Sequence, residues 1–501
     1  MLSTTSGLAT QVIDTKNAKV SAAALPVPKP FSKIPGPRGL PFIGSLWDYI
    51  KPGGYTFEKM FEVYQLRAQK YGPIFKERLG HVTNIVISDP EQYNKVIFNE
   101  GKYPNRKPLE PLAYYRSHVR DVGLGVVNAQ GEEWRNQRSI ISKKMLRIQE
   151  VARFTDVMSD VATDLVTRID KIKDPTTSEV PELEFEVFKW AMESVCTFLF
   201  DTRIGCFQEP PSMLAQEFLY NLLEFFKSMQ PLMYNMPVYR YYPTQLWKKF
   251  SSHLDSVFAI GQMYVDKKIT ALDKISQKGK LRESMMEFLL AQEGLTKQEV
   301  NSTAIEMMTG GVETVSNATL WNLFCLAKNQ KVQEQLYAEI SHVVPEDVAE
   351  ITPQHLAKLP LVKACVKECF RLYPITFATS RHIQKDMEIG GYHIPEGSHV
   401  QANLYYMGRD ASLFPEPMEF RPERWLRDDD NRYKALSNLV WGHGPRMCIG
   451  RRIAEQEIHI ILAKIIQKFQ LKYHHAEDVE PVLHTIMTGD RPFRIAFNRR
   501  K

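Results

Sequence analysis

The feature that most constrains this chain is a glycine-rich stretch near its end that carries one cysteine. Residues 441–452 read WGHGPRMCIGRR, and the residues after them have helical spacing. Cys448 therefore enters a helix from a turn, where unpaired N–H groups and the positive end of the helix dipole favour a thiolate. Such a thiolate is a ligand for a soft metal. A buried structural cysteine is the alternative, because cysteine often packs as a small hydrophobe.

The composition excludes several classes of protein. Of 501 residues, 44% are hydrophobic and 24% are charged, as in ordinary globular proteins. The net charge of +6 is small, and no basic run is interleaved with aromatic residues, so a nucleic-acid partner is not expected. The six cysteines lack paired spacing, which fits a reducing compartment. Cys365 and Cys369 are predicted to lie in the core.

Residues 1–33 differ in composition from the rest of the chain. They are rich in Ser, Thr and Ala, carry four lysines against one acid, and contain no apolar run of the about 20 residues that span a bilayer. This composition predicts a cleavable organelle transit peptide, with a disordered extension as the alternative. No repeat or linker divides residues 34–501, so a single domain is expected there.

The periodicity predicts a mainly α-helical fold with a minor β-sheet region. Residues 74–87 alternate around a Gly-His turn, which predicts a hairpin, and Asp89-Pro90 is typical of a helix start. From about residue 150 to 345 the apolar period is helical. Short strands are predicted within 387–400 and 469–497.

A long helix is predicted after the capping box from Thr296 to Glu299. Gly310 and Gly311 lie inside it, and each costs about 1 kcal/mol relative to alanine. Either a ligand or a neighbouring helix must therefore approach the backbone there. Glu313 and Thr314 follow at once, as an acid beside an alcohol.

Three further groups of charged residues each have an ordinary structural reading. Trp134 and Arg138 are four apart, like an aromatic–cation pair on a helix surface. Glu368 and Arg371 are three apart, as in many exposed ion pairs. The third group is a run of basic residues typical of a solvated face, formed by Lys363, Lys367, Arg451 and Arg452.

Taken together, these motifs resemble those of the cytochrome P450 family over about residues 34–501, in the family's order. Residues 441–452 resemble the family's haem-binding loop, with Trp441 where phenylalanine is usual. The resemblance implies the cytochrome P450 fold, with haem b between the long central helix and the cysteine loop. It implies Cys448 as the axial thiolate ligand of the haem iron.

The resemblance also implies roles for residues outside this loop. Glu313 and Thr314 would deliver protons to oxygen bound at the iron. A buried ionic clamp behind the loop would consist of Glu368, Arg371 and Arg424. The resemblance implies that Gly311 contacts the haem. It also implies that the haem propionates are held by Trp134, Arg138, Arg381 and Arg446.

Within the family, the mitochondrial-type, ferredoxin-dependent branch is the one most resembled. Lys363 and Lys367 resemble its ferredoxin-docking lysines, and Arg451 and Arg452 extend the same face. No flavin or dinucleotide fingerprint is present, so electrons would come from an adrenodoxin-like ferredoxin fed by an NADPH-dependent reductase. The aromatic segment 225–247 resembles the family's helix–loop–helix over the substrate entrance, which suggests peripheral attachment to the inner mitochondrial membrane. An endoplasmic-reticulum location is the alternative.

The implied reaction is the insertion of one oxygen atom of O2 into a lipophilic substrate, either sterol- or steroid-like or a foreign compound. Two alternatives are a haem-thiolate isomerase or dehydratase that needs no external electrons, and a non-catalytic haem- or lipid-binding protein.

Overall fold

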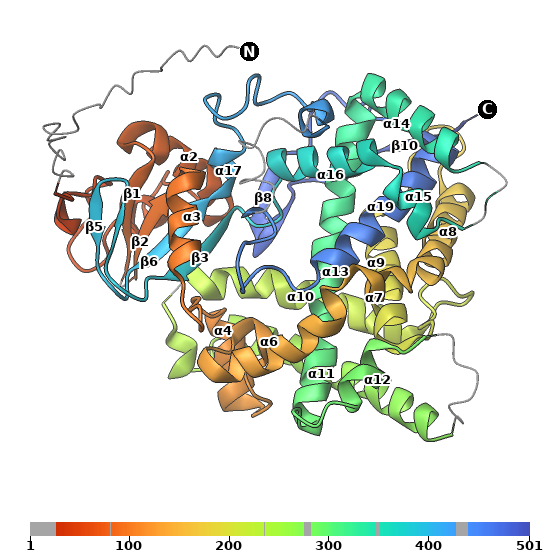
Figure 1. Cartoon of the computed structure of the whole chain (residues 1–501), viewed down its shortest axis with the longest axis horizontal. Helices are drawn as coiled ribbons and strands as arrows, with labels where there is room; N and C mark the ends of the chain where they lie inside the picture. Colours follow the sequence, from red (N-terminus) through yellow and green to blue (C-terminus); the bar gives the residue numbers. More distant parts are fainter. Residues whose placement is uncertain are drawn as a thin grey trace, which may run out of the picture.

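A computed structural model describes residues 27–80, 82–234, 236–274, 282–345, 348, 350–426 and 439–500. Helices make up most of this part of the chain, and the strands gather at one end of the molecule, on the left in Figure 1. The predicted mainly helical fold with a minor sheet region is therefore confirmed. Of the predicted N-terminal extension, residues 1–26 lie outside the described residues. Lys29 pairs with Tyr392 in an isolated bridge.

The largest sheet has four strands in the order β1-β2-β6-β3. The predicted hairpin is present as β1 (Ile74–Leu79) and β2 (Val82–Ile87), which pair antiparallel. Strand β6 (His399–Asn403) pairs with β2 in parallel. Strand β3 (Ala378–His382) pairs antiparallel with β6 and forms the edge of the sheet. Three small antiparallel pairs fall in the predicted regions: β4 (Met387–Ile389) with β5 (Tyr392–Ile394), β7 (Phe469–Lys472) with β10 (Ala496–Arg499), and β8 (Pro481–His484) with β9 (Ile486–Gly489).

The helical part is organised around α13 (Lys297–Lys328), whose C-terminal half is buried almost completely. The predicted capping box is present, since Thr296 and Glu299 each bond the other's backbone. Asp89 likewise caps the predicted helix α3 (Pro90–Asn99). Helix α13 packs against α9 (Leu183–Phe200), α16 (Pro360–Leu372) and α19 (Arg451–Lys468). These helices form the main hydrophobic core, which includes the buried Cys365 and Cys369, as predicted.

The other helices surround this core (Figure 1). Within the described residues, no helix has both the length and the apolar character needed to cross a bilayer. The longer ones are α2 (Met60–Tyr71), α6 (Gly131–Met145), α8 (Thr155–Ile172), α10 (Met213–Tyr234), α11 (Gln245–Lys274) and α14 (Gln330–Val343). The shorter ones are α1 (Trp47–Ile50), α4 (Glu110–Tyr114), α5 (Gly125–Asn128), α7 (Ile148–Ala152), α12 (Met285–Leu290), α15 (Pro353–Ala357), α17 (Leu404–Met407) and the single turns η1 (Phe31–Lys33), η2 (Phe57–Lys59), η3 (Tyr115–Val119), η4 (Val238–Arg240) and η5 (Pro422–Trp425).

Candidate active site

The cysteine loop folds back on itself just before α19 begins. Gly442 and Gly444 have φ values of +73° and +72°, which glycine adopts without strain. The Cys448 N–H donates to the Trp441 carbonyl at 2.7 Å and closes the loop. Of the six cysteines, all in the described part of the chain, Cys448 is the exposed one. Its sulfur is therefore the one that a ligand can reach.

The surroundings of the Cys448 sulfur act on its charge in two directions. Although a ligand can reach the sulfur, the protein atoms around the loop displace water from it, and this desolvation is the largest effect and raises the pKa of the thiol. The Gly450 N–H, which donates to the sulfur, and the positive charges of Arg138 and Arg106 lower the pKa. Hydrogen-bond donors and cations around a sulfur favour the thiolate, the form that binds a metal.

Arg446 connects the loop to the segment before α6. Its Nε donates to the Pro104 carbonyl at 3.0 Å, and its Nη2 donates to the Ala129 carbonyl at 2.9 Å. The guanidinium lies over the Trp134 ring, 4.0 Å from its centroid. The remaining nitrogen, Nη1, is buried without a partner among the described residues. Burial, with three neighbouring arginine charges, lowers the pKa of Arg446 to about 9.

Trp134 and Arg138 lie on one face of α6, as their spacing predicts. Arg138 donates from Nη2 to the Met447 carbonyl at 2.7 Å, next to Cys448. Burial lowers the pKa of Arg138 to about 10, although the charge of Cys448 opposes this. Trp134 is 2% exposed, and the Arg446 guanidinium lies over its ring. The structure thus brings the loop and α6 together.

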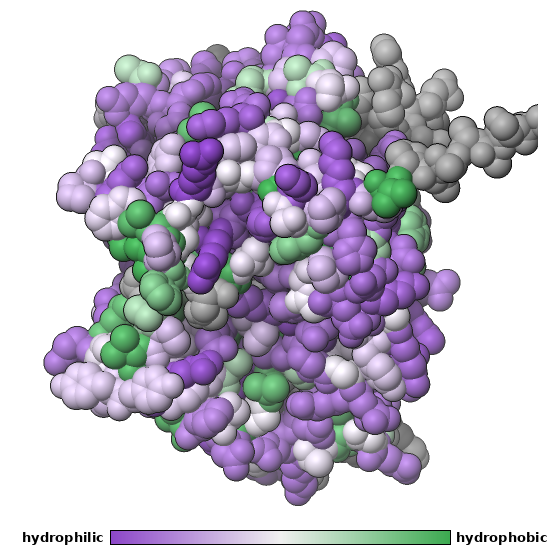
Figure 2. Space-filling model, turned by 90° about the vertical axis from the view of Figure 1, so that its left-hand side faces the viewer, coloured by the Kyte–Doolittle hydropathy of each residue, from purple (hydrophilic) through white to green (hydrophobic). Residues whose placement is uncertain are grey.

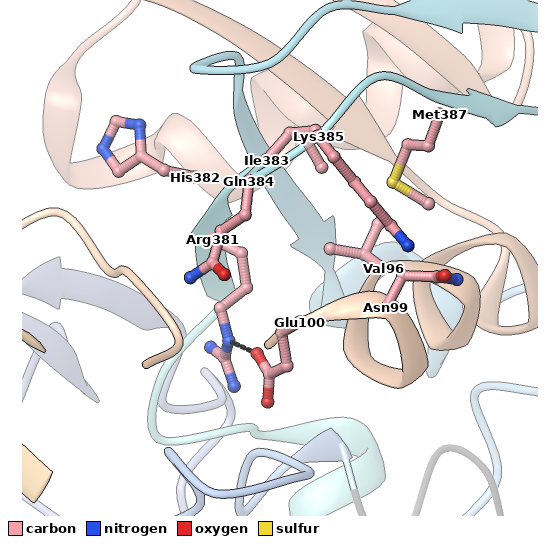
Figure 3. Close-up of a pocket in the computed structure, with 9 residues that line it drawn as sticks. All are labelled: Val96, Asn99, Glu100, Arg381, His382, Ile383, Gln384, Lys385 and Met387. Atoms are coloured by element: carbon pink, nitrogen blue, oxygen red, sulfur yellow. Dashed lines mark hydrogen bonds and ion pairs between the residues drawn. The ribbon is translucent and has the colours of Figure 1, made fainter. Parts of the chain in front are cut away.

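Arg381 comes to the same place from β3, but its donors are already engaged. It forms an ion pair with Glu100 (Figure 3). Its Nη2 donates to the His443 carbonyl at 3.0 Å. The second oxygen of Glu100, Oε1, is buried without a partner among the described residues. Burial raises the pKa of Glu100, although Arg381 opposes this. Arg381 therefore holds the loop, and a propionate contact would have to share this arginine with Glu100.

Sequence reasoning missed a fourth arginine of this cluster, Arg106. Its Nη2 donates to the Val127 carbonyl at 2.8 Å, and its charge acts on both Cys448 and Arg446. Burial lowers the pKa of Arg106. It lies in a loop with no motif around it, so only the fold reveals it.

These residues fit a haem group. A reachable sulfur lies beside a cluster of four arginines, and the unpartnered Nη1 of Arg446 is a buried donor that a carboxylate would satisfy. Haem offers an iron for the sulfur and two propionates for the arginines.

On α13, the acid and the alcohol differ in their surroundings. Glu313 is 6% exposed, its Oε2 is buried without a partner among the described residues, and burial raises its pKa well above the usual range. Lys227 of α10 opposes that shift. Thr314 is half-buried, and its Oγ1 donates to the Gly310 carbonyl at 2.8 Å. A protonated Glu313 can donate a proton, which suits a relay.

The two glycines before this pair have different surroundings. A Cβ on Gly311 would lie 2.9 Å from Cγ2 of Val195 on α9, so Gly311 lets these helices pack closely. A Cβ on Gly310 would meet no atom within 4 Å. Close packing of α13 on α9 therefore explains the glycine at position 311. Contact between Gly311 and the haem remains a prediction, and the position of Gly311 against α9 does not favour it.

The predicted ionic clamp is assembled at the end of α16. Glu368 and Arg371 are 0% and 1% exposed and form two hydrogen bonds, of 2.8 and 2.9 Å. Arg424 donates from Nε to Glu368 at 3.0 Å. Trp425, which the motif did not predict, donates from Nε1 to the other oxygen at 2.8 Å. Trp441 of the cysteine loop packs edge-on against Phe370, at 5.2 Å between ring centroids, so this helix supports the loop.

The predicted basic face is also assembled, because α16 packs against α19. Lys367 is exposed and Lys363 is half-buried. Arg451 and Arg452 both form ion pairs with Glu455, at 2.8 and 3.2 Å. Glu455 thus offsets part of the charge that the sequence suggests. The two lysines supply most of the net positive charge of this face.

A further buried ion pair lies on the first half of α13, where sequence reasoning predicted none. Arg116 donates from Nη1 to Glu306 at 3.0 Å, and the Val126 N–H donates to the other oxygen at 2.9 Å. Gly125 has φ +69°, and a Cβ there would lie 2.1 Å from Glu306. The pair fixes residues 116–126 against α13. Its members are 190 positions apart, so spacing carries no signal for it.

Comparison with known proteins decides the family. Residues 34–497 match the family described as Cytochrome P450. The chain belongs to the cytochrome P450 family. "Cytochrome P450 10" of Lymnaea stagnalis is 50% identical to it, over 97% of this chain and 89% of that protein.

Two other relatives have names that state a reaction. The mitochondrial sterol 26-hydroxylase of Rattus norvegicus is 32% identical, over 88% of this chain and 83% of the relative. The mitochondrial cholesterol side-chain cleavage enzyme of Bos taurus is 30% identical, over 94% and 90%. This P450 is therefore a haem monooxygenase, as the motifs predicted.

Proposed function

We propose that this P450 takes electrons from a ferredoxin in mitochondria and oxidises a lipophilic substrate of the sterol or steroid class, or a foreign compound of similar character. The relatives named above support the location, because two carry "mitochondrial" in their names. The same names refer to a sterol and to cholesterol. The observation that carries the oxygenase chemistry is the reachable Cys448 sulfur among four arginines, in a chain of this family.

Each residue of the site has a distinct task in this proposal. The haem, when bound, supplies O2 activation and electron transfer at its iron. Cys448 would be the ligand of that iron, and the Gly450 N–H and nearby cations favour its thiolate against the desolvation that raises its pKa. Arg446, Arg138, Arg106 and Trp134 orient the propionates, with Arg381 shared with Glu100. Among these contacts, a hydrogen bond from Arg446 Nη1 to a propionate has the clearest support, because this donor is buried without a partner among the described residues.

Glu313 and Thr314 move protons in this proposal. The Thr314 hydroxyl is a donor to the Gly310 carbonyl and leaves its oxygen free to accept from a water molecule. Burial raises the pKa of Glu313 well above its usual range and so favours the protonated acid, which can supply a proton to the water that Thr314 positions.

Replacing Thr314 by alanine is expected to divert electrons from product to hydrogen peroxide. Without the hydroxyl, the water that delivers the proton loses the acceptor that positions it, and groups that take part in proton transfer commonly contribute about 10²-fold or more to a rate. Oxygen uptake, peroxide and product are measured together in the reconstituted system. Thr309→Ala is the matched control, because Thr309 lies on the same helix and also bonds its own backbone. If Thr314→Ala couples electrons to product as the wild type does, Thr314 is not in the relay.

The proposed ferredoxin site is the face formed by Lys363, Lys367, Arg451 and Arg452. An acidic one-electron carrier is steered to such a face, and association weakens as salt screens the charges. Since Glu455 offsets the two arginines, the lysines are expected to dominate.

Lys367→Gln is expected to raise the KM for ferredoxin about three- to tenfold, with little change in the kcat at saturating ferredoxin. An exposed cation at an interface rim acts mainly on association. Reduction rates are measured over a series of salt concentrations, and the variant should depend on salt less steeply. Lys248→Gln is the control, since Lys248 is exposed on α11. Equal KM values for the wild type and Lys367→Gln would refute this docking site.

Peripheral membrane contact is proposed through the segment between α10 and α11. Met236, Val238, Tyr241 and Tyr242 are 80%, 49%, 90% and 67% exposed. Apolar side chains at such exposure favour a membrane interface. Figure 2, which views the molecule from the side that carries most of the strands in Figure 1, shows apolar side chains gathered along its left edge. Other residues of the predicted segment, including Phe225 and Trp247, are buried and belong to the core.

The experiment that tests the whole proposal uses the purified holoenzyme with a ferredoxin, its reductase and NADPH. Binding of sterols, steroids and foreign lipophiles is first screened by the shift of the haem spectrum. Ligands that bind are then tested for oxygen uptake and hydroxylated product. Product formed without any electron donor would instead support the isomerase alternative. Turnover with a flavoprotein reductase but with no ferredoxin would refute ferredoxin dependence.

A further inference from the structure

A cavity of about 240 Å3 lies outside the haem site, between α4, η3 and η4. This is many times the roughly 10–15 Å3 that such a space needs to hold one water molecule, so a ligand larger than water fits. It is lined by Glu110, Ala113, Tyr114, Ser117, His118 and Arg240. Most of these side chains are polar, although apolar residues surround the cavity.

The lining carries one fixed anion and one fixed cation, side by side. Arg240 and Glu110 form an ion pair, with 41% and 34% of their side chains exposed. Ser117 and His118 add a hydroxyl and an imidazole, whose Oγ and Nδ1 atoms are 2.7 Å apart. An exposed ion pair contributes little to stability, so opening it costs little. A ligand with both charges could replace one internal pair by two pairs of its own.

The position of the cavity suggests where such a ligand comes from. Arg240 lies between Val238 and Tyr241, two of the exposed residues proposed above to contact a membrane. On the other wall, Val119 follows His118 and is 53% exposed. The cavity would thus open at the level of lipid headgroups when these side chains enter the bilayer.

From this geometry we propose that the cavity binds the phosphoethanolamine headgroup of a phospholipid. The phosphate accepts hydrogen bonds from Arg240, and the ammonium group donates to Glu110. The exchange leaves the net charge of the cavity unchanged. This inference rests on the membrane contact proposed above and adds the identity of the lipid.

Two other headgroup types fit the lining less well. A trimethylammonium group prefers the open faces of aromatic rings. One face of Tyr114 is stacked on the His118 ring, with centroids 4.7 Å apart and 14° between planes, and the Arg240 guanidinium lies over the Tyr114 ring at 5.9 Å from its centroid. Tyr239 and Trp247 pack against Tyr114 in T-shaped contacts. An acidic headgroup without a cation would place its charge against Glu110 without satisfying it. The primary ammonium of phosphoethanolamine meets this carboxylate.

The test is vesicle flotation of the full-length holoenzyme. One set of vesicles is phosphatidylcholine, and in the other half of this lipid is replaced by phosphatidylethanolamine with the same acyl chains, so that net charge is equal. The wild type is expected to bind the second set about threefold more tightly, because new charge-assisted hydrogen bonds form at an exposed site. Glu110→Gln is expected to lose this preference while still floating. Glu293→Gln, a change of an exposed glutamate elsewhere, is expected to keep it.

The outcomes separate the two proposals. Bilayer stress caused by phosphatidylethanolamine acts on all three proteins alike, so a preference that survives in Glu110→Gln would overturn the headgroup site. Equal binding of the wild type to both vesicle sets would overturn it as well, and the membrane contact would stand. No flotation with either set would overturn the membrane contact itself. Haem and circular dichroism spectra confirm that each variant is folded.

Discussion

Replacing Cys448 by serine is expected to lower monooxygenase activity more than about 100-fold and to remove the thiolate signature from the carbon-monoxide spectrum of the reduced protein. Changes around a metal ligand already cost about 10- to 100-fold, so losing the ligand itself should cost more. The serine hydroxyl occupies the same place, but it does not ionise near neutral pH as a thiol can. The local environment of Cys448, with the Gly450 N–H and two arginine charges, suits an anion that serine cannot provide.

The control for this variant is a second cysteine. Cys206→Ala removes a buried thiol far from the loop in sequence and should cost about 1 kcal/mol of stability with the spectrum intact. Haem content is measured separately from activity, because the arginines can retain haem that lacks its axial ligand. A Cys448→Ser protein with the wild-type spectrum and turnover would show that another residue holds the iron.

The parts of this site that could be predicted from sequence are those whose residues are close along the chain. The Cys448 loop and the Glu368–Arg371 pair each fall within one short segment, so spacing alone places their members together. Trp134 and Arg138 follow from one helix face in the same way. The capping box at Thr296 also placed the start of α13 correctly.

The parts that could not be predicted depend on tertiary packing. Arg106 reaches the site from a loop, and Glu100 meets Arg381 over 281 positions of sequence. These residues have a role in the site because it is buried, and a guanidinium group that is removed from water needs a hydrogen-bonding partner. Glu100 also changes the interpretation of Arg381, which holds the His443 carbonyl as well. Sequence spacing carries no information on which arginine donors remain free.

The sequence alone also suggests more positive charge on the basic face than the structure shows, and it leaves the role of Gly311 open. Two adjacent arginines after the cysteine loop suggest strong positive charge, but Glu455 lies one helical turn further on and pairs with both. For Gly311, the sequence shows that a close approach is needed but not what approaches. The contact with Val195 identifies a helix. In both cases the missing information is which neighbour the fold supplies.

Replacing Glu368 by alanine is expected to destabilise the protein by about 3–5 kcal/mol, or to prevent folding with haem. Removing one partner of a buried pair leaves the others as uncompensated charges. Arg371 would remain 1% exposed with its charge unmatched, and Arg424 and the Trp425 N–H would lose their acceptor. Since Phe370 on the same helix packs on Trp441, the loss should reach the cysteine loop. Thermal unfolding and haem content are the measurements.

The chain offers a matched control next to the clamp. Glu423 is an exposed acid beside Arg424, and Glu423→Gln should change stability by no more than about 0.5 kcal/mol. Glu368→Gln separates charge from shape, because the amide keeps an oxygen for one arginine or for Trp425 but cannot balance two guanidinium groups. We expect its stability to fall between those of the wild type and Glu368→Ala. If Glu368→Ala unfolds at the wild-type temperature and retains haem, the buried clamp does not support the loop, and the packing of Phe370 on Trp441 must suffice.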